Sequence, residues 1–469
     1  MKKLLITLVM ITGLLSMYSC SNKQNSQSDK TASTTRPAEE TTTDDASAEP
    51  TTKTQIKKDP DIFTYNYVHG DEGYFNLLSE TPEFKTKSYE KAACWAYAAA
   101  SSMETSYTVR TGSSISVDPN SIINLVWDTN KSDGFIKKVD APNSEMGGSA
   151  WMVTETLSRG FGGLTLESAV ILTDKGRDAL KNALRSRGGV YANIPESSDK
   201  KEWYGDYITM NDPRGGTPSH AITIIGWDDN FPKNYFDEKA SQDGAWIAYN
   251  STEGLLGSYF YVSYDTPLND IVSFRISDKY SSVLSHDVGN ENDRYIKRGD
   301  ETTVANVFHG AGNLSAVGTY NDFDEAQDIK IEIYDSGFRT LMYSQDATLN
   351  YHGYQTIDLD SPVSVADYAI VITYTKGAPV EGETINYDTY DYVTSCGSGQ
   401  SYVFLGDWKN KASIFHAVEV PEGEEEAPAV DHTYDYIKDL KDMSDGNIKE
   451  ALGIDFTPNN CCIKALYTY

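Results

Sequence analysis

The chain has 469 residues, 39% of them hydrophobic and 12% aromatic, which is typical of a globular protein with two or three domains. Its 69 acidic and 40 basic residues give a formal net charge of −29, which argues against a nucleic-acid partner and against binding to anionic lipid surfaces. Five cysteines without paired CxxC spacing exclude a disulfide scaffold and a structural zinc site.

The N-terminal segment, residues 1–20, has the order of features found in a signal peptide. Two lysines are followed by the apolar run Leu4–Leu15, which is shorter than the about 20 residues of a membrane-spanning helix. A small residue then directly precedes Cys20, and this arrangement resembles the lipobox of bacterial lipoproteins. The resemblance implies that Cys20 becomes a lipidated N-terminus that holds the chain to a membrane outside the cytoplasm. An ordinary secretory signal is the alternative.

Residues 21–60 are rich in Ser, Thr, Asp, Glu and Gln and contain no aromatic residue. Such a segment cannot bury enough apolar surface to offset the entropy lost on ordering, so we predict a disordered tether. Aromatic residues become frequent from Ile62 onward. This change in composition predicts that a folded domain begins near residue 61 and extends to about residue 280.

Helix signals come first in the predicted domain 61–280. Cys94 opens an Ala-rich segment of high helix propensity, and Asp118 precedes Pro119 as an N-cap does. The predicted helices are residues 94–107, 119–126, 150–157 and 177–187. The predicted strands are Val190–Ile194, His220–Trp227, Ala245–Asn250 and Ser258–Tyr264. Helices followed by strands indicate an α+β domain with a helical half, a β half and a cleft between them.

Short strands replace the helices beyond about residue 290. Isoleucines alternate with polar residues in Asp328–Asp335, which predicts a half-buried strand. Similar runs are Tyr354–Leu359, Tyr368–Tyr374, Ser401–Leu405 and the closing strand Cys461–Tyr469. We therefore predict that residues 290–469 form an all-β sandwich or jelly-roll-like domain. An insertion near 421–458 contains an acidic spacer and a short predicted helix.

Three residues of the first domain have the chemistry and spacing of a nucleophilic site. Cys94 stands at the start of a predicted helix, where the partial positive charge of the helix favours a thiolate. A thiolate nucleophile needs an imidazole nearby and a group that orients the imidazole. His220 follows Cys94 by 126 residues and Asn250 follows it by 156, and both lie on predicted strands. His69 is the other histidine of this domain and is more typical of a surface or packing residue.

The residues around these three positions resemble the catalytic blocks of the papain-like cysteine peptidases. The matching runs are Cys-Trp-Ala-Tyr from Cys94, His-Ala-Ile-Thr-Ile-Ile-Gly-Trp-Asp from His220, and Gly-Ala-Trp-Ile-Ala-Tyr-Asn-Ser, which contains Asn250. The run Glu-Met-Gly-Gly at residues 145–148 resembles the glycine pair that lines the family's substrate cleft. The resemblance spans residues 62–275, and the β region after it is similar to the lectin-like domain of some bacterial members.

The resemblance implies a papain-like two-lobed domain, with one helical and one β lobe, that hydrolyses peptide bonds through a thioester. Cys94 would be the nucleophile, His220 the general base and then acid, and Asn250 the residue that orients the imidazole. Gly147 and Gly148 would line the substrate site, since a residue without a Cβ lets the substrate backbone approach. The resemblance implies a peptide or protein substrate and no metal or organic cofactor. It also makes a glycan or another cell-surface molecule the candidate ligand of the β domain.

The sequence departs from the family pattern at three places. Ser88 replaces the family's oxyanion glutamine, or Lys87 does if a one-residue gap is allowed, and either is a substitute donor by hypothesis. Thr252 stands where the family usually has a tryptophan that shields the His–Asn hydrogen bond. Lys91 and Glu145 replace a disulfide of the family, and their opposite charges predict a surface ion pair.

These departures leave two other functions open. One is an inactive papain-like module that serves as a surface adhesin or binds peptides or glycans. The other is a transferase that passes the acyl group to an amine instead of water. The sequence also leaves open whether Cys396, Cys461 and Cys462 include one disulfide or remain free thiols.

Overall fold

The computed structural model describes residues 73–79, 92–128, 130–195, 201–204, 207–236, 240–251, 259–405, 437–442 and 445–468. The predicted signal peptide (1–20) with Cys20, the predicted tether (21–60) and His69 therefore lie outside the described residues. In the described part of the chain, no helix combines the length and the apolar character needed to cross a membrane.

The first half of the chain contains four α-helices in its described residues, at the places where the sequence predicts them. They are α1 (Cys94–Thr111), α2 (Pro119–Val126), α3 (Ala150–Leu157) and α4 (Arg177–Arg187). The side chain of Asp118 accepts a hydrogen bond from Asn120 N, so α2 begins after the predicted N-cap. α1 continues beyond its predicted end and stops before Gly112, which adopts φ +72° and donates to Thr108 O at 2.8 Å.

An antiparallel meander of strands confirms the predicted strand positions in the same half. It consists of β4 (Val190–Pro195), β7 (Pro218–Asp228), β8 (Ala245–Tyr249) and β9 (Tyr259–Ser263), paired in that order. The other strands of this half are β1 (Tyr74–Asn76), β2 (Gly134–Lys137), β3 (Thr165–Ile171), β5 (Lys201–Tyr204), β6 (Tyr207–Met210) and β10 (Asn269–Ser277). Short 3₁₀ turns are η1 (Leu77–Ser79), η2 (Asn143–Glu145) and η4 (Lys233–Tyr235).

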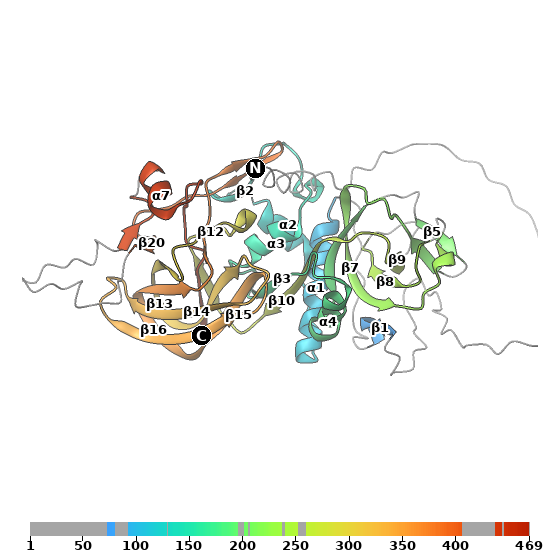
Figure 1. The fold of residues 1–469 in the computed structure, drawn as a ribbon, viewed down its shortest axis with the longest axis horizontal. Helices are drawn as coiled ribbons and strands as arrows, with labels where there is room; N and C mark the ends of the chain where they lie inside the picture. The colour runs from blue at the N-terminus through green and yellow to red at the C-terminus, as the bar shows by residue number, and fades with distance from the viewer. Residues whose placement is uncertain are drawn as a thin grey trace, which may run out of the picture.

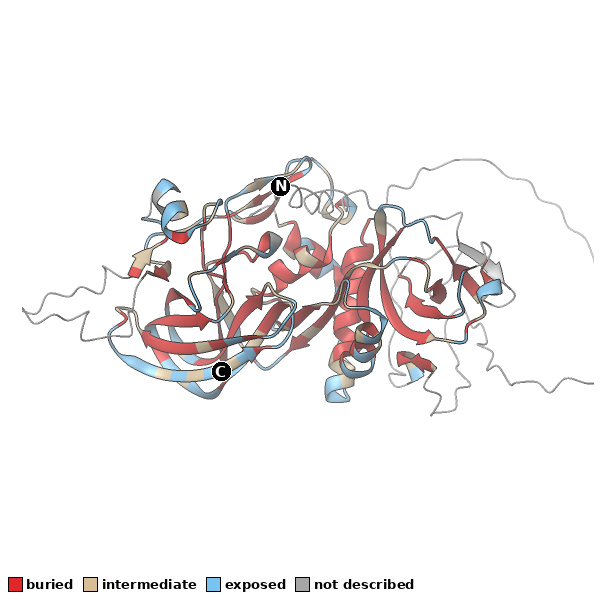
Figure 2. Cartoon of the chain, in the orientation of Figure 1, coloured by how far each residue is buried: buried red, intermediate tan, exposed pale blue. Residues whose placement is uncertain are grey.

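Helix α1 runs between the meander and the helices α2 and α3 (Figure 1). Its first thirteen residues, Cys94–Ser106, are all buried (Figure 2). Many of these side chains are small, so neighbouring elements approach the helix from several sides. At Gly188, which precedes β4, an added Cβ would lie 2.6 Å from Ser106 N. Residues of α1, α2 and α3 share one hydrophobic cluster with Tyr191 and Ala221, whereas α4 and the rest of the meander form a second one.

Strands dominate the second half. β13 (Thr302–Asn321) pairs along its length with β16 (Gly353–Tyr374), and β14 (Gln327–Asp335) pairs with the end of β16. The strands predicted at Tyr354–Leu359 and Tyr368–Tyr374 are therefore parts of one strand, which corrects the prediction of two. The residues between them are mostly exposed and lack the alternation from which a half-buried strand is predicted.

The remaining elements of the second half are shorter. They are β11 (Ser282–Ser285), η5 (Glu291–Asp293), β12 (Tyr295–Ile296), β15 (Leu341–Leu349), β17 (Ala378–Pro379), β18 (Ile385–Asn386), β19 (Tyr390–Val393), β20 (Ser401–Phe404), β21 (Ile437–Asp439), α7 (Asp445–Leu452) and β22 (Lys464–Thr468). α7 confirms the short helix predicted in the insertion. β22 confirms the closing strand and pairs with both β11 and β13.

Strand pairing joins the two halves at two places. β16 pairs with β3, where Gly353 lies opposite Val170, and β19 pairs with β2. Gly353 adopts φ +107°, and a Cβ there would lie 2.2 Å from Ala169 O, so this close approach requires glycine. The domain boundaries 61–280 and 290–469 stay predictions, and the two segments share sheet hydrogen bonds.

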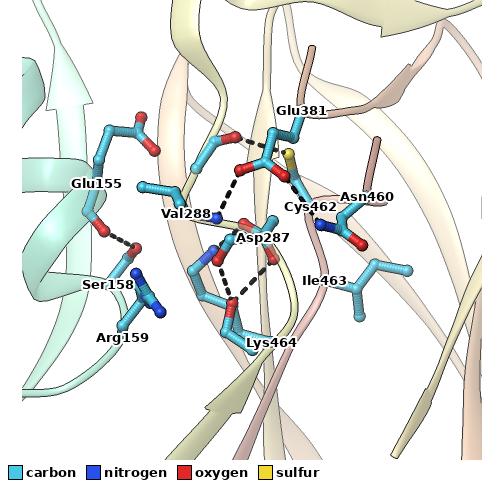
Figure 3. A network of polar contacts seen from close by, with 12 residues as sticks. Glu155, Ser158, Arg159, Asp287, Val288, Glu381, Asn460, Cys462, Ile463 and Lys464 are labelled. Atoms are coloured by element: carbon cyan, nitrogen blue, oxygen red, sulfur yellow. Dashed lines mark hydrogen bonds and ion pairs between the residues drawn. The ribbon is translucent and has the colours of Figure 1, made fainter. Parts of the chain in front are cut away.

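A buried polar network lies at the same junction (Figure 3). Lys464 of β22 forms an ion pair with Asp287, and both side chains are fully buried. Glu381 accepts hydrogen bonds from Val288 N at 2.7 Å and from Asn460 Nδ2 at 2.9 Å. Burial first, and then the charge of Asp287, raise the pKa of Glu381 to about 8.

Glu155 of α3 extends this network from the first half. Its carboxyl accepts a hydrogen bond from Tyr320 OH at 3.2 Å, and a Cβ on Gly289 would lie 0.8 Å from its Oε2. Burial raises the pKa of Glu155 well above its ordinary value. The single ammonium group of Lys464 compensates one carboxylate, so burial favours the protonated form of Glu155 and Glu381. The network thus ties α3 to the second half through neutral and paired groups.

The Glu381→Gln variant should show a free energy of unfolding that depends less on pH. The carboxyl has a pKa of about 8 in the folded protein, against an ordinary value of 4.5. Its contribution to stability is complete below pH 4.5 and is lost as the pH rises through 8. In that window the folded state holds the extra proton, and one such group changes stability by up to about 1.4 kcal/mol per pH unit.

Urea unfolding measured at several pH values within this window tests the expectation. The slope of unfolding free energy against pH should be shallower in Glu381→Gln than in the unchanged protein. Asp346→Asn, a change at an exposed carboxyl on β15, serves as the matched control and should leave the slope as it is. Equal slopes in all three proteins would contradict the burial of a protonated carboxyl at Glu381.

Candidate active site

Cys94 is the first residue of α1. Ala93 precedes it as the N-cap, and the amides of Ala96 and Tyr97 donate to Ala93 O at 3.0 and 3.2 Å. The side chain of Ala93 makes no capping hydrogen bond, so it supplies no acceptor at this end of the helix. A thiol in this position is stabilised as a thiolate by the partial charge of the helix N-terminus. The structure thus places Cys94 at a helix start, as the sequence predicts.

His220 and Asn250 are joined by a hydrogen bond in the meander. His220 lies on β7 and Asn250 directly follows β8, the strand that pairs with β7. His220 Nε2 lies 3.0 Å from Asn250 Oδ1, and each residue is 3% exposed. Because an amide oxygen only accepts hydrogen bonds, Nε2 is assigned as the donor and the neutral ring leaves Nδ1 as the basic atom. Among the described residues, Nδ1 has no hydrogen-bond partner.

Strand β7, which carries His220, contacts helix α1, which carries Cys94. Thr223 Oγ1 donates to Ala98 O at 3.1 Å, which fixes β7 against the first turns of the helix. Gly189 N donates to Thr105 Oγ1 at 2.9 Å, and a Cβ on Gly189 would lie 2.9 Å from Thr223 Cγ2, so a later turn of α1 also lies near β7. Cys94 precedes Ala98 by about 6 Å along the helix, and His220 precedes Thr223 by about 10 Å along the strand.

The glycine segment predicted to line the substrate site lies against the first turn of α1. Trp95 Nε1 donates to Met146 O at 3.3 Å, and Trp127 Nε1 donates to Gly147 O at 3.2 Å. A Cβ on Gly148 would lie 2.4 Å from Cδ2 of the Trp95 ring. Glycine at this position is therefore required by the packing of Trp95, whatever its contact with substrate. No role for Trp127 is predicted from the sequence. Its indole, at the C-terminal end of α2, contacts the same glycine segment.

Gly148→Ala should disturb the start of α1. The added methyl group meets the ring of fully buried Trp95, and relief requires a shift of the ring or of the glycine segment. Overpacking of this kind costs about 1–3 kcal/mol, and we expect a lower free energy of unfolding together with lower thiol reactivity at Cys94. The matched control is Gly337→Ala, where the nearest atom to the new Cβ is 3.9 Å away. Equal denaturant midpoints for the two variants would contradict the contact.

Several residues named from the sequence lie outside the described residues. They are Cys20, Lys87, Ser88, Lys91 and Thr252. The oxyanion hypothesis and the ion pair predicted between Lys91 and Glu145 therefore stay predictions. Glu145 itself belongs to η2, directly before Met146.

The three described cysteines of the second half are free thiols. Cys396, Cys461 and Cys462 form no disulfide, which settles the alternative that the sequence left open. Burial raises the pKa of Cys396 to about 12, and burial also raises the pKa of Cys461 and Cys462. These thiols are therefore protonated and unreactive at neutral pH.

Comparison with known proteins finds similarity in the second half and in the overall fold. Residues 286–420 match the family described as Lectin like domain. The structure is similar to that of the clostridial cysteine protease Cwp84 after propeptide cleavage, with a TM-score of 0.61 and 16% identity over 84% of this chain and 99% of that chain. A comparison with curated proteins finds no match.

A second structure gives the same result. It comprises the cysteine protease and lectin-like domains of Cwp84, a surface layer associated protein of Clostridium difficile, with a TM-score of 0.61 and 16% identity. The match covers 89% of this chain and 91% of that chain, so it includes both halves. The chain therefore has the fold of a papain-like cysteine protease with a lectin-like domain.

Proposed function

We propose that this chain is an extracytoplasmic cysteine endopeptidase that hydrolyses peptide bonds with Cys94, His220 and Asn250. The observation that supports this most strongly is the 3.0 Å contact between His220 Nε2 and Asn250 Oδ1. This contact leaves Nδ1 as the base, on the strand that packs against the helix carrying Cys94. An activated thiol, a base and a group that orients the base are the three parts of such a nucleophilic site.

The proposed reaction proceeds by acyl transfer. His220 Nδ1 takes the proton of the Cys94 thiol, and the thiolate attacks the carbonyl carbon of the peptide bond. The resulting imidazolium gives its proton to the leaving amine, and the acyl group remains on sulfur as a thioester. A water molecule, deprotonated by the imidazole, then attacks the thioester and releases the carboxylic acid and the thiol. Asn250 holds the ring so that Nδ1 faces the reacting atoms throughout.

The proposed substrate site lies between the helical lobe with Cys94 and the β lobe with His220. Two hydrophobic clusters support this division: one contains residues of α1 to α3 together with Tyr191 and Ala221 of the meander, and the other contains α4 and most of the meander. Gly147 and Gly148 would bind the substrate main chain, and Lys87 or Ser88 would donate to the oxyanion. Lipidation of Cys20 would hold the enzyme at a membrane outside the cytoplasm. Cwp84, described as surface layer associated, supports a location at the cell surface.

A peptide library incubated with the purified chain tests the proposed function. The unchanged protein should cleave a subset of peptides, and mass spectrometry of the products gives the bond that is cut. Cys94→Ala should cleave none of them, because the nucleophile is absent. Cleavage that persists in Cys94→Ala, or a library that stays intact with the unchanged protein, would contradict a peptidase that uses this thiol.

A second candidate function is an inactive papain-like module that binds a peptide, a glycan or another cell-surface ligand. The burial of Cys94, which is 1% exposed, supports this candidate because a substrate carbonyl must reach the sulfur. The match of residues 286–420 to lectin-like domains makes a glycan the first ligand to test. A glycan array probed with Cys94→Ala separates binding from hydrolysis, since this variant retains the β domain and lacks the nucleophile.

A further inference from the structure

A cavity of about 270 Å³ lies at the junction of the two halves. On one side it is lined by α3, β3 and β10, and on the other by η5, β13, β16 and the start of β19. Cavities that take drug-sized ligands measure about 300–1,000 Å³, so this one suits a smaller molecule. None of the residues proposed for peptide hydrolysis is part of its described lining.

The lining of the cavity is acidic and aromatic. Its carboxyl groups belong to Glu155, Asp270, Glu291 and Asp293, and the described lining contains no lysine or arginine. The ring of His352 lies next to this lining, with Nε2 3.4 Å from Asp293. Glu291 accepts a hydrogen bond from Tyr387 OH, and the nearby ammonium of Lys464 is paired with Asp287. One imidazole cannot balance the carboxylates of Asp270 and Asp293 together. The cavity therefore has an excess of negative charge that a cationic ligand would compensate.

Five aromatic rings complete the lining, and their faces attract cations. Tyr387 and Tyr390 stack with ring centroids 4.6 Å apart, and Tyr320 and Tyr354 meet edge to face at 5.2 Å. Trp151, on α3, is the fifth. Carboxylates together with tyrosine and tryptophan rings are the groups that bind an ammonium ion in a partly dry site.

The protein already holds one buried ammonium group with the same rings. Lys464 Nζ lies 5.3 Å from the ring centroid of Tyr320 and 5.9 Å from that of Tyr354. Its charge is balanced by the carboxylate of Asp287 (Figure 3). Tyr320 and Tyr354 also line the cavity, whose described lining contains no lysine or arginine. The same rings that contact the ammonium group of Lys464 could therefore contact the ammonium group of a ligand.

Two further groups in the lining, the hydroxyl of Tyr390 and the carboxyl of Asp270, could bind a ligand. The hydroxyl of Tyr390 is buried and has no hydrogen-bond partner among the described residues. Such a group destabilises the folded protein unless a hydrogen-bond partner satisfies it. The carboxyl of Asp270 accepts a hydrogen bond from Asn193 Nδ2 at 2.6 Å, and burial raises its pKa.

We infer that this cavity binds a small organic cation with a primary ammonium group, held by Asp270, Glu291 and the tyrosine rings. In the described part of the chain, these carboxylates do not converge into a group able to hold a metal ion. The lining carboxyl groups of Asp270 and Glu291 come from different elements, β10 and η5, which suits an extended amine with methylene groups against the rings. Because the lining comes from both halves, the bound amine would also stabilise the junction between them.

Calorimetric titration of the purified chain with 1,5-diaminopentane tests this inference. The neutral analogue 1,5-pentanediol has the same length and should not bind, since it lacks the charge. Asp270→Asn should weaken diamine binding by about tenfold or more. This substitution keeps the backbone, because Asp270 adopts φ +45° and asparagine tolerates that conformation. Asp346→Asn, at an exposed carboxyl of β15, is the matched control and should bind as the unchanged protein does.

Tyr390→Phe separates binding from folding. It removes a buried hydroxyl without a partner, so the free energy of unfolding without diamine should be unchanged or higher. Binding should nevertheless weaken by roughly threefold to tenfold if the hydroxyl contacts the amine. The inference is overturned by absent diamine binding, by equal binding of the diol, by equal affinities in Asp270→Asn and Asp346→Asn, or by binding of calcium chloride alone.

Discussion

His220→Ala should reduce kcat/KM for peptide hydrolysis by roughly 10⁴-fold or more. The ring supplies the base that deprotonates Cys94 and the acid that protonates the leaving amine, and no other described imidazole lies in this half of the chain. Asn250→Ala should have a smaller effect, because it removes the 3.0 Å contact that orients the ring and leaves the ring in place. Initial rates on a peptide cleaved by the unchanged protein provide the measurement.

The matched control for this pair is His309→Ala. His309 lies on β13 with 71% of its side chain exposed, and its contact with Asp367 is a surface pair. This variant should retain the full rate. Because His220 is buried, the thermal midpoint of His220→Ala must also be measured, so that a loss of folding is not taken for a loss of the base. A folded His220→Ala protein with more than a tenth of the original rate would contradict the proposed role.

Lys464→Met should destabilise the protein by about 3–5 kcal/mol, which is the usual cost of leaving a buried charge without its partner. Lys464 and Asp287 are each fully buried, and methionine has a similar length without the ammonium group. The expected loss is a large fraction of the stability of a typical domain. Equilibrium urea unfolding gives the free energy, and unfolding followed separately in each half shows whether the junction opens first.

Two further variants make this prediction specific. Lys376→Met removes a lysine whose partner Glu325 is largely exposed, and it should cost at most about 1 kcal/mol. Adding Asp287→Asn to Lys464→Met removes the orphaned carboxylate and should restore part of the lost stability. If Lys464→Met and Lys376→Met unfolded at the same urea concentration, the buried ion pair would not stabilise the junction.

The local features of the first half could be predicted from the sequence. The Ala-rich run from Cys94, the Asp118-Pro119 pair and the β-branched run around His220 each determine their own secondary structure through propensity or capping. The three catalytic candidates could be named because each lies in a short run with a characteristic composition. The hydrogen bond between His220 and Asn250 then follows from the pairing of β7 with β8.

Long-range pairing could not be predicted in the same way. Gly353 opposite Val170 brings together segments far apart in the chain, and neither segment has a pattern that identifies its partner. The single strand β16 could not be predicted either, because its middle is exposed on both faces and lacks the alternation of apolar and polar residues. The cavity at the junction depends on this pairing, so it could not be predicted from the sequence.

One residue of the buried network, Lys464, could have been recognised from the sequence. Lys464 follows Cys462 and Ile463 and precedes an apolar run in the predicted closing strand. A lysine in such a strand is expected to find a buried carboxylate, because an unpaired buried ammonium is costly. The identity of that partner, Asp287, required the structure, since it depends on the pairing of β22 with β11 and β13.

The most direct test of the proposed site is the reaction of an irreversible epoxide thiol probe, followed by intact mass and peptide mapping. Among Cys94, Cys396, Cys461 and Cys462, we expect the probe to attach to Cys94 alone in the unchanged protein, because the protonated thiols of the other three react slowly. We expect this label to be lost in His220→Ala and kept in His309→Ala. No label on Cys94 in the unchanged protein, or equal labelling in His220→Ala, would contradict an imidazole-activated thiolate at the start of α1.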